Sequence, residues 1–358
     1  MSDAVATVAG VVILATVALD IFRSLLVPRA STRVLRVAPL LAMALFSGWQ
    51  AMADRLPRQG VRQTLRASFA PLMLILTFAA WAGLLIFGFG LLFWAERTHF
   101  SIGFPTFGDA VYSAGAAFST LGVNGTVDGN YARLVVLICS ISGLAIVTVV
   151  ATFLIAIQSG FTQRETLVLR LESHVTLPPA GIAILETYGR ENIVGRLAPF
   201  FDDWERWTAE VAITHRAFSI MLFFRSNDSR CEWLAALGAV LDAAALIDST
   251  VGDVPAEVRA STHFVLRTGA RSLDDMARQF TGGRDEAMQV ADDERFRDHR
   301  RRLREAGYDV TADEAAALGR YVERRRTYAG ALVALARRLH IDVDERTSAD
   351  EDSQPVGT

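Results

Sequence analysis

The chain has 358 residues, of which 51% are hydrophobic and 21% are charged, and its mean hydropathy is +0.29. Soluble globular chains usually carry more charge, so we expect part of this one to lie in lipid. The formal net charge of −3 leaves no basic excess to neutralise phosphates, which argues against nucleic acid as a partner. The two cysteines, Cys139 and Cys231, stand far apart and exclude a disulfide framework or a CxxC metal site.

Three apolar segments are long enough to cross a membrane: residues 4–27, 68–95 and 134–157. Each exceeds the roughly 20 residues that a hydrocarbon core of about 30 Å requires. The first lacks the basic start and the cleavage site of a signal peptide, so we expect a retained helix. A shorter run, residues 37–52, is interrupted by Pro39; an interfacial helix is favoured there, with a fourth span as the alternative.

The arginines predict how these spans are oriented. Only Arg97 and Arg133 lie between the second and third spans. Seven lie between the first and second spans: Arg29, Arg33, Arg36, Arg55, Arg58, Arg62 and Arg66. Because cytoplasmic loops are enriched in basic residues, we expect the N-terminus and the connection 96–133 outside and everything after Gln158 in the cytoplasm. The chain is therefore predicted to be a multi-pass protein of the inner cell membrane.

Two opposite charges, Asp20 and Arg23, lie near the inner end of the first span, on one face of the expected helix. Ionisable groups at such a depth can relay charge within a membrane. A local ion pair whose arginine reaches toward the interface is the interpretation that we favour.

The connection 96–133 contains an apolar stretch, residues 109–119, with Asp109 at the position that suits a helix start. Eleven helical residues span about 16 Å, which is half of a bilayer. A polar, glycine-spaced turn follows, STLGVNG at residues 119–125. Since irregular backbone at membrane depth must be buried in protein or line water, this segment is either a re-entrant pore loop or a surface loop. In a pore loop, an extended segment from Thr120 would turn successive carbonyls toward a cation.

The stretch FGDAVYSAGAAFSTLGV, residues 107–123, resembles the pore helix and filter of the potassium channels that have two membrane helices per pore. Gly143 follows Gly122 by 143 − 122 = 21 positions, close to that family's spacing from filter to inner-helix hinge. More narrowly, most of residues 1–250 resembles a group of bacterial potassium-channel-like membrane proteins. The motif DIFR at residues 20–23 and the helical stretches 203–218 and 224–246 carry that likeness.

The resemblance implies a filter and a gate at defined positions. Asp109 would begin the pore helix, and Gly143 would be a gating hinge, with close helix packing as the alternative reason for a glycine there. The filter would comprise Thr120, Leu121, Gly122, Val123, Asn124 and Gly125. The family pattern has an aromatic residue, a glycine and an acid where this chain has the last three of these residues. Gly122 permits backbone angles that other residues resist, and Asn124 is a common substitute where φ is positive.

The remainder is charged and reads as helices throughout, which predicts an all-α cytoplasmic domain at residues 161–342 and a disordered acidic tail at 343–358. The expected helices are residues 179–188, 193–224, 232–247, 256–280, 286–306 and 312–339. No nucleotide-binding motif is present, the histidines are scattered, and no catalytic group or metal cluster can be assembled, so an enzyme is not expected.

The predicted organisation is an all-α membrane protein with an N-terminal region at 1–66 and a pore module at 67–160. That module holds an outer helix 68–95, a pore helix 109–119, a filter 120–125 and an inner helix 132–158. Because one chain supplies one pore loop, a homotetramer in the lipid bilayer is implied, with potassium as the expected permeant ion and no cofactor. A non-conducting scaffold or sensor, whose cytoplasmic domain binds an unknown partner, is the alternative.

Overall fold

The computed structural model describes residues 2–26, 48–49, 51–52, 55, 59–226, 228, 230–285, 293–341 and 343. Within these residues every regular element is helical, and two isolated bridges are the only β pairing, so the all-α prediction is confirmed. All of the acidic tail except Val343, and most of the segment 37–52, lie outside the described residues. The chain divides into two compact units, residues 1–159 and 160–358.

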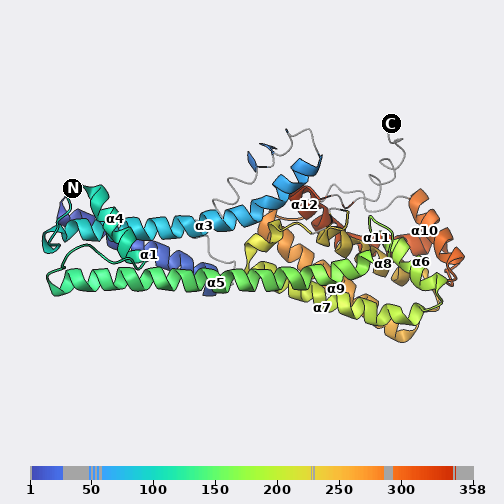
Figure 1. Cartoon of the computed structure of the whole chain (residues 1–358). Helices are drawn as coiled ribbons and strands as arrows, with labels where there is room; N and C mark the ends of the chain where they lie inside the picture. Colours follow the sequence, from blue (N-terminus) through green and yellow to red (C-terminus); the bar gives the residue numbers. More distant parts are fainter. Residues whose placement is uncertain are drawn as a thin grey trace. The chain divides into compact units, whose positions relative to one another are not determined.

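The first unit contains the three expected apolar helices (Figure 1). They are α1 (Asp3–Leu26), α3 (Gln59–Ala95) and α5 (Asn130–Glu172), and the last of these continues into the second unit. All three are long and apolar enough to cross a membrane. In the most apolar 18-residue stretch of each helix, only 22–33% is buried. Helix α5 runs well past the expected end near residue 158, because no proline occurs before Pro178 to stop it.

Helices α1 and α3 pack closely through small residues. A Cβ placed on Gly10 would lie 2.8 Å from the carbonyl oxygen of Gly88, so the two backbones approach each other where both residues are glycine. Further along the same pair, the indole Nε1 of Trp81 donates a hydrogen bond of 2.9 Å to the buried carboxylate of Asp20. Among the described residues no ion pair joins Asp20 to Arg23, so the expected local pair is replaced by a contact between helices.

The second unit is a bundle built around α8 (Trp233–Thr250), which contacts five of the described helices. These are α6 (Gly181–Arg190), α7 (Leu197–Ala217), α9 (Ala256–Phe280), α11 (Glu314–Arg326) and α12 (Ala329–Leu339). Helix α8 is a fourth candidate span by length and composition, but 83% of its 18 residues are buried inside the bundle. A helix that is apolar on all sides suits either a membrane or a protein core, and its neighbours here supply the core.

Two predicted helices of this unit are broken in the structure. The stretch 193–224 divides into a 3₁₀ turn at Val194–Arg196, α7 (Leu197–Ala217) and a second 3₁₀ turn at Ser219–Phe223. Met221, Leu222 and Phe223 are all buried, and three consecutive residues cannot share one face of an α-helix. The stretch 312–339 breaks between α11 and α12, where buried Tyr328 turns its hydroxyl to Asp242. Helix α10 (Asp293–Glu305) covers most of the helix predicted at residues 286–306.

Candidate functional site

The segment between α3 and α5 holds a short helix, α4 (Phe107–Phe118), which begins two residues before the expected start. Thr106 caps it: its hydroxyl accepts a hydrogen bond from the Asp109 backbone, and the Asp109 carboxylate accepts one of 2.8 Å from the Thr106 backbone. This reciprocal capping satisfies two N–H groups that the first helical turn leaves without partners. The Asp109 charge also lies at the positive end of the helix, where it is stabilising.

Glycine, alanine and cysteine bring α4 against both neighbouring helices (Figure 1). On the α3 side, a Cβ at Gly90 would lie 3.0 Å from the Cα of Val111. On the α5 side, the thiol of Cys139 donates a hydrogen bond of 3.4 Å to the carbonyl oxygen of Ala114. One turn later, a Cβ at Gly143 would overlap the carbonyl oxygen of Phe118 and lie 2.7 Å from its carbonyl carbon. Gly143 is therefore a close-packing position at the end of α4.

Helix α4 ends in a left-handed turn at Thr120, whose φ is 63°. The Thr120 N–H donates to the carbonyl of Ala117 at 3.1 Å, and the Leu121 N–H donates to that of Ala116 at 2.9 Å. This pattern closes the end of a helix and is usually made by glycine. A β-branched residue adopts this backbone at a cost in free energy. The extended conformation expected at Thr120 is therefore not found in the single chain.

Beyond this turn, positive φ angles fall on glycines. Gly122 has φ 86° and Gly125 has φ 79°, whereas Asn124 does not have a positive φ. The expectation that Asn124 stands in for a left-handed glycine is thus wrong, and Gly125 takes that conformation one residue later. No atom of the described residues lies within 4 Å of a Cβ at Gly122, so only its backbone angles require glycine.

The end of the loop is hydrogen-bonded to the segment that follows α3. Phe100 and Val127 form an antiparallel bridge, and the Ser101 N–H donates to the Thr126 carbonyl at 3.0 Å. The Thr126 N–H donates to the Ser101 hydroxyl at 2.9 Å. A Cβ at Gly125 would lie 2.5 Å from that hydroxyl oxygen, so a side chain there would displace Ser101 and disturb its hydrogen bond with Thr126. The sequence reasoning missed Ser101, because nothing local relates it to a residue 25 positions later.

Large apolar side chains are left uncovered around this loop in a single chain. Leu121 is 82% exposed, and Tyr112 on α4 is 70% exposed. One stretch of α5 adds further exposed residues: Tyr131, Leu134, Leu137, Ile138, Ile141 and Leu144. Exposed apolar side chains of this number mark contact with lipid or with another protein surface.

A buried polar junction in the second unit was also missed. Arg164, near the end of α5, is 2% exposed and donates to the Glu165 carboxylate at 3.0 Å and to the Phe224 carbonyl at 2.9 Å. The Trp207 indole donates to the Arg164 carbonyl at 2.9 Å. In sequence Arg164 looks like one more charge on a polar helix, and its partners are contributed by distant residues. The junction fastens the end of α5 to α7 and to the turn after it.

His215 lies on the same side of α7 as Trp207 and is fully buried. Its Nδ1 is 2.8 Å from the Val211 carbonyl oxygen, and burial lowers the pKa of His215 to about 3. The ring is therefore neutral at physiological pH. Across the described ranges, no group of three or more His, Cys, Asp or Glu side chains could hold a metal ion. Helix α7 thus contributes packing at this point and not a titrating site.

Comparisons with protein-family models, with curated proteins and with solved structures find no match to this chain. Within the described residues, the sequence and geometry of the chain show an all-α protein with four helices long and apolar enough to cross a membrane, which indicates a multi-pass membrane protein.

Proposed function

We propose that this chain forms a homotetrameric cation channel that conducts potassium through the backbone carbonyls of residues 120–125. The observation that carries the proposal is α4: a capped helix of 12 residues, about 18 Å long, packed between two candidate spans. A helix of that length reaches halfway across a bilayer and leaves a polar turn there. The partial negative charge at its C-terminal end favours a cation beside that turn.

Four copies are needed because one chain contributes one loop, and a filter must close around an axis. The uncovered apolar residues around the loop support this assembly. Leu121 and Tyr112 project from the loop and from α4, where a neighbouring copy would shield them from water. An isolated loop would instead place unpaired backbone groups against lipid, which is costly.

Gating would use α5, which continues without a break from Asn130 to Glu172. The contact between Gly143 and the Phe118 carbonyl adds a mechanical consequence. Because the two backbones touch, α5 cannot shift toward α4 at this level unless the end of α4 moves with it. Movement of the inner helix would therefore be felt at the residues directly before the filter.

The test is potassium flux through the purified full-length chain in liposomes. Wild-type protein should conduct, and Gly122→Ala should conduct less, because φ of 86° strains any residue that has a Cβ while the open space there avoids a clash. Gly83→Ala is the matched control: it lies in α3, no described residue has an atom within 4 Å of its Cβ position, and it should conduct as wild type does. Absence of flux in every lipid and at every voltage would contradict the proposal.

A non-conducting scaffold is the second candidate, and the backbone at Thr120 favours it. A residue committed to capping α4 is not free to line a pore in the single chain. The double variant Val123→Tyr with Asn124→Gly moves the loop toward the family pattern and leaves Gly125 in place, because Ser101 fills the space beside it. Conduction gained by a silent protein would support the scaffold, whereas conduction by the unmodified chain would refute it.

A further inference from the structure

A cavity of about 330 Å³ lies in the second unit between the end of α5, α6 and α7. Its volume falls within the range of small-molecule sites, roughly 300–1,000 Å³. Leu167 and Leu171 of α5 form an apolar wall. Tyr188, Phe200 and Trp204 line the opposite sides, with ring centroids 5.5 Å apart for the first pair and 6.3 Å for the second.

Positive charge is concentrated at this cavity. Arg170 and Arg196 both line it, and among the described residues of its lining Asp203 is the one carboxylate. Arg170 is 3.5 Å from that carboxylate, in a loose and largely exposed pair. Within the described part of the chain, Arg196 forms no ion pair, so one guanidinium remains to attract an anion. Burial raises the pKa of Tyr188, and the charges of Arg196 and Arg170 oppose that rise, whereas the charge of Asp203 adds to it.

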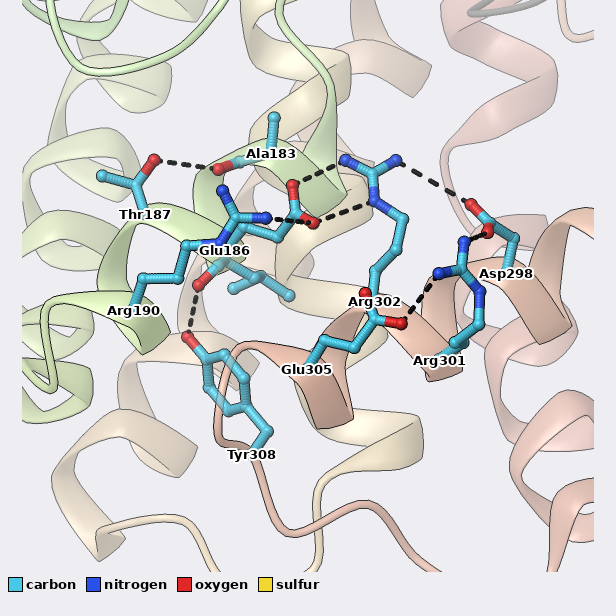
Figure 2. A network of polar contacts seen from close by, with 10 residues as sticks. Ala183, Glu186, Thr187, Arg190, Asp298, Arg301, Arg302, Glu305 and Tyr308 are labelled. Atoms are coloured by element: carbon cyan, nitrogen blue, oxygen red, sulfur yellow. Dashed lines mark hydrogen bonds and ion pairs between the residues drawn. The ribbon is translucent and has the colours of Figure 1, made fainter.

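The wall formed by α6 is held rigidly from behind (Figure 2). The guanidinium of Arg302, on α10, donates to both carboxylate oxygens of Glu186, at 3.0 and 2.6 Å. The Tyr308 hydroxyl donates to the Leu185 carbonyl at 2.8 Å. Residues 186 and 188 point to different sides of a helix, so α6 is fixed on α10 by one face and presents Tyr188 to the cavity by another. A preorganised wall lowers the entropic cost of binding a ligand.

We propose that this cavity binds a small organic anion that carries a flat ring, with the ring against Tyr188 and Phe200 and the anionic group at Arg196. Flat rings stack on aromatic side chains, and a guanidinium recognises carboxylate or phosphate through paired N–H donors. A purine mononucleotide and an aromatic carboxylate both belong to this class. The bound molecule would join the end of α5 to α6 and α7.

A regulatory consequence follows, and it rests on the proposed channel function. Because Leu167 and Arg170 belong to the helix that would gate the pore, occupancy of the cavity would favour one position of α5. The binding claim itself does not need conduction and is measured separately.

The binding test is isothermal titration of the full-length chain in phosphatidylcholine nanodiscs with AMP and with benzoate. Adenosine and inorganic phosphate are the probes that lack either the charge or the ring. At least one ringed anion should bind once per chain, more tightly than adenosine or phosphate. Arg196→Gln should weaken it at least tenfold, and Phe200→Leu should also weaken it. Arg267→Gln, an exposed arginine of α9 outside the cavity lining, should bind as wild type does.

The proposal is overturned if neither AMP nor benzoate binds, if phosphate binds as tightly as AMP, or if Arg196→Gln binds unchanged. Arg196 is exposed, so its replacement should leave folding intact, and an unchanged thermal unfolding curve verifies this. Flux measured with the ligand inside the vesicles then tests regulation alone. A chain that binds without conducting refutes the proposed function, whereas a chain that conducts without binding refutes this inference.

Discussion

Replacement of Gly143 by alanine tests whether this glycine is a packing position or only a hinge. In the structure the carbonyl carbon of Phe118 lies 2.7 Å from the Cβ position, whereas ordinary contact begins at 3.4 Å. The two backbones must therefore separate by more than about 0.7 Å, the difference between these distances, because the carbonyl oxygen of Phe118 lies closer still. The obstacle is backbone, which cannot move aside as a flexible side chain can.

The magnitude follows from two opposing effects. Overpacking costs about 1–3 kcal/mol, and a backbone obstacle places this site at the upper end. Alanine recovers about 0.5–1 kcal/mol of helix propensity relative to glycine. The net expectation is that the contact between α4 and α5 loses about 2 kcal/mol.

The assay uses Cys139, one turn before Gly143, whose buried thiol contacts the Ala114 carbonyl. In a background where Cys231 is alanine, maleimide labelling reports how often α4 separates from α5. A loss of 2 kcal/mol corresponds to labelling about 30-fold faster, at 1.4 kcal/mol per factor of ten. Gly83→Ala should label at the wild-type rate. If Gly143→Ala does the same, the close approach is not what requires glycine there.

Three further changes have outcomes that the structure specifies. Trp81→Phe removes the donor to the buried Asp20 carboxylate and should destabilise the pairing of α1 and α3 by about 1–3 kcal/mol, seen as a lower unfolding temperature in detergent. Thr106→Ala should cost about 1 kcal/mol through the lost helix cap, and Thr106→Ser should restore it, as read by hydrogen exchange in α4. The hydrogen bond from Arg302 lowers the pKa of Glu186, so its stabilisation is present above the ordinary pKa of 4.5 and is lost as the pH falls below it. Glu186→Gln should therefore destabilise the chain at neutral pH and flatten the acid limb of its pH–stability curve; an unchanged acid limb would contradict this.

The elements best predicted from sequence are those whose boundaries are local. Helix α9 occupies residues 256–280 as expected, and α1 lies within one residue of its predicted ends, because amphipathic periodicity or a long apolar run defines each. The breaks at Phe218 and Tyr328 were not predicted. Both satisfy contacts with distant residues, and a helical pattern in the sequence continues through them.

In the candidate loop, too, locally determined features could be predicted from sequence, whereas features that depend on distant residues could not. The start of α4 at Thr106 and Asp109 follows from capping chemistry within four residues. The hydrogen bond between Ser101 and Thr126 joins residues far apart in sequence, and no local pattern marks it. The left-handed backbone of Thr120 could not be expected either, since threonine disfavours it.

The burial of α8 has a consequence for the order in which the chain is made. During synthesis this apolar helix of 18 residues leaves the ribosome before α11 exists to cover it, and it could then be taken up by the bilayer. Asp242, in the middle of α8, opposes that, since an acid at the centre of an inserting helix costs about 2.5–3.5 kcal/mol, and Asp248, in the last turn, adds a smaller cost. Later, Arg325 approaches Asp242 at 3.0 Å and Arg324 approaches Asp248 at 2.6 Å. We expect these two carboxylates first to disfavour insertion of α8 into the bilayer. Later they pair with the arginines of α11, which covers α8.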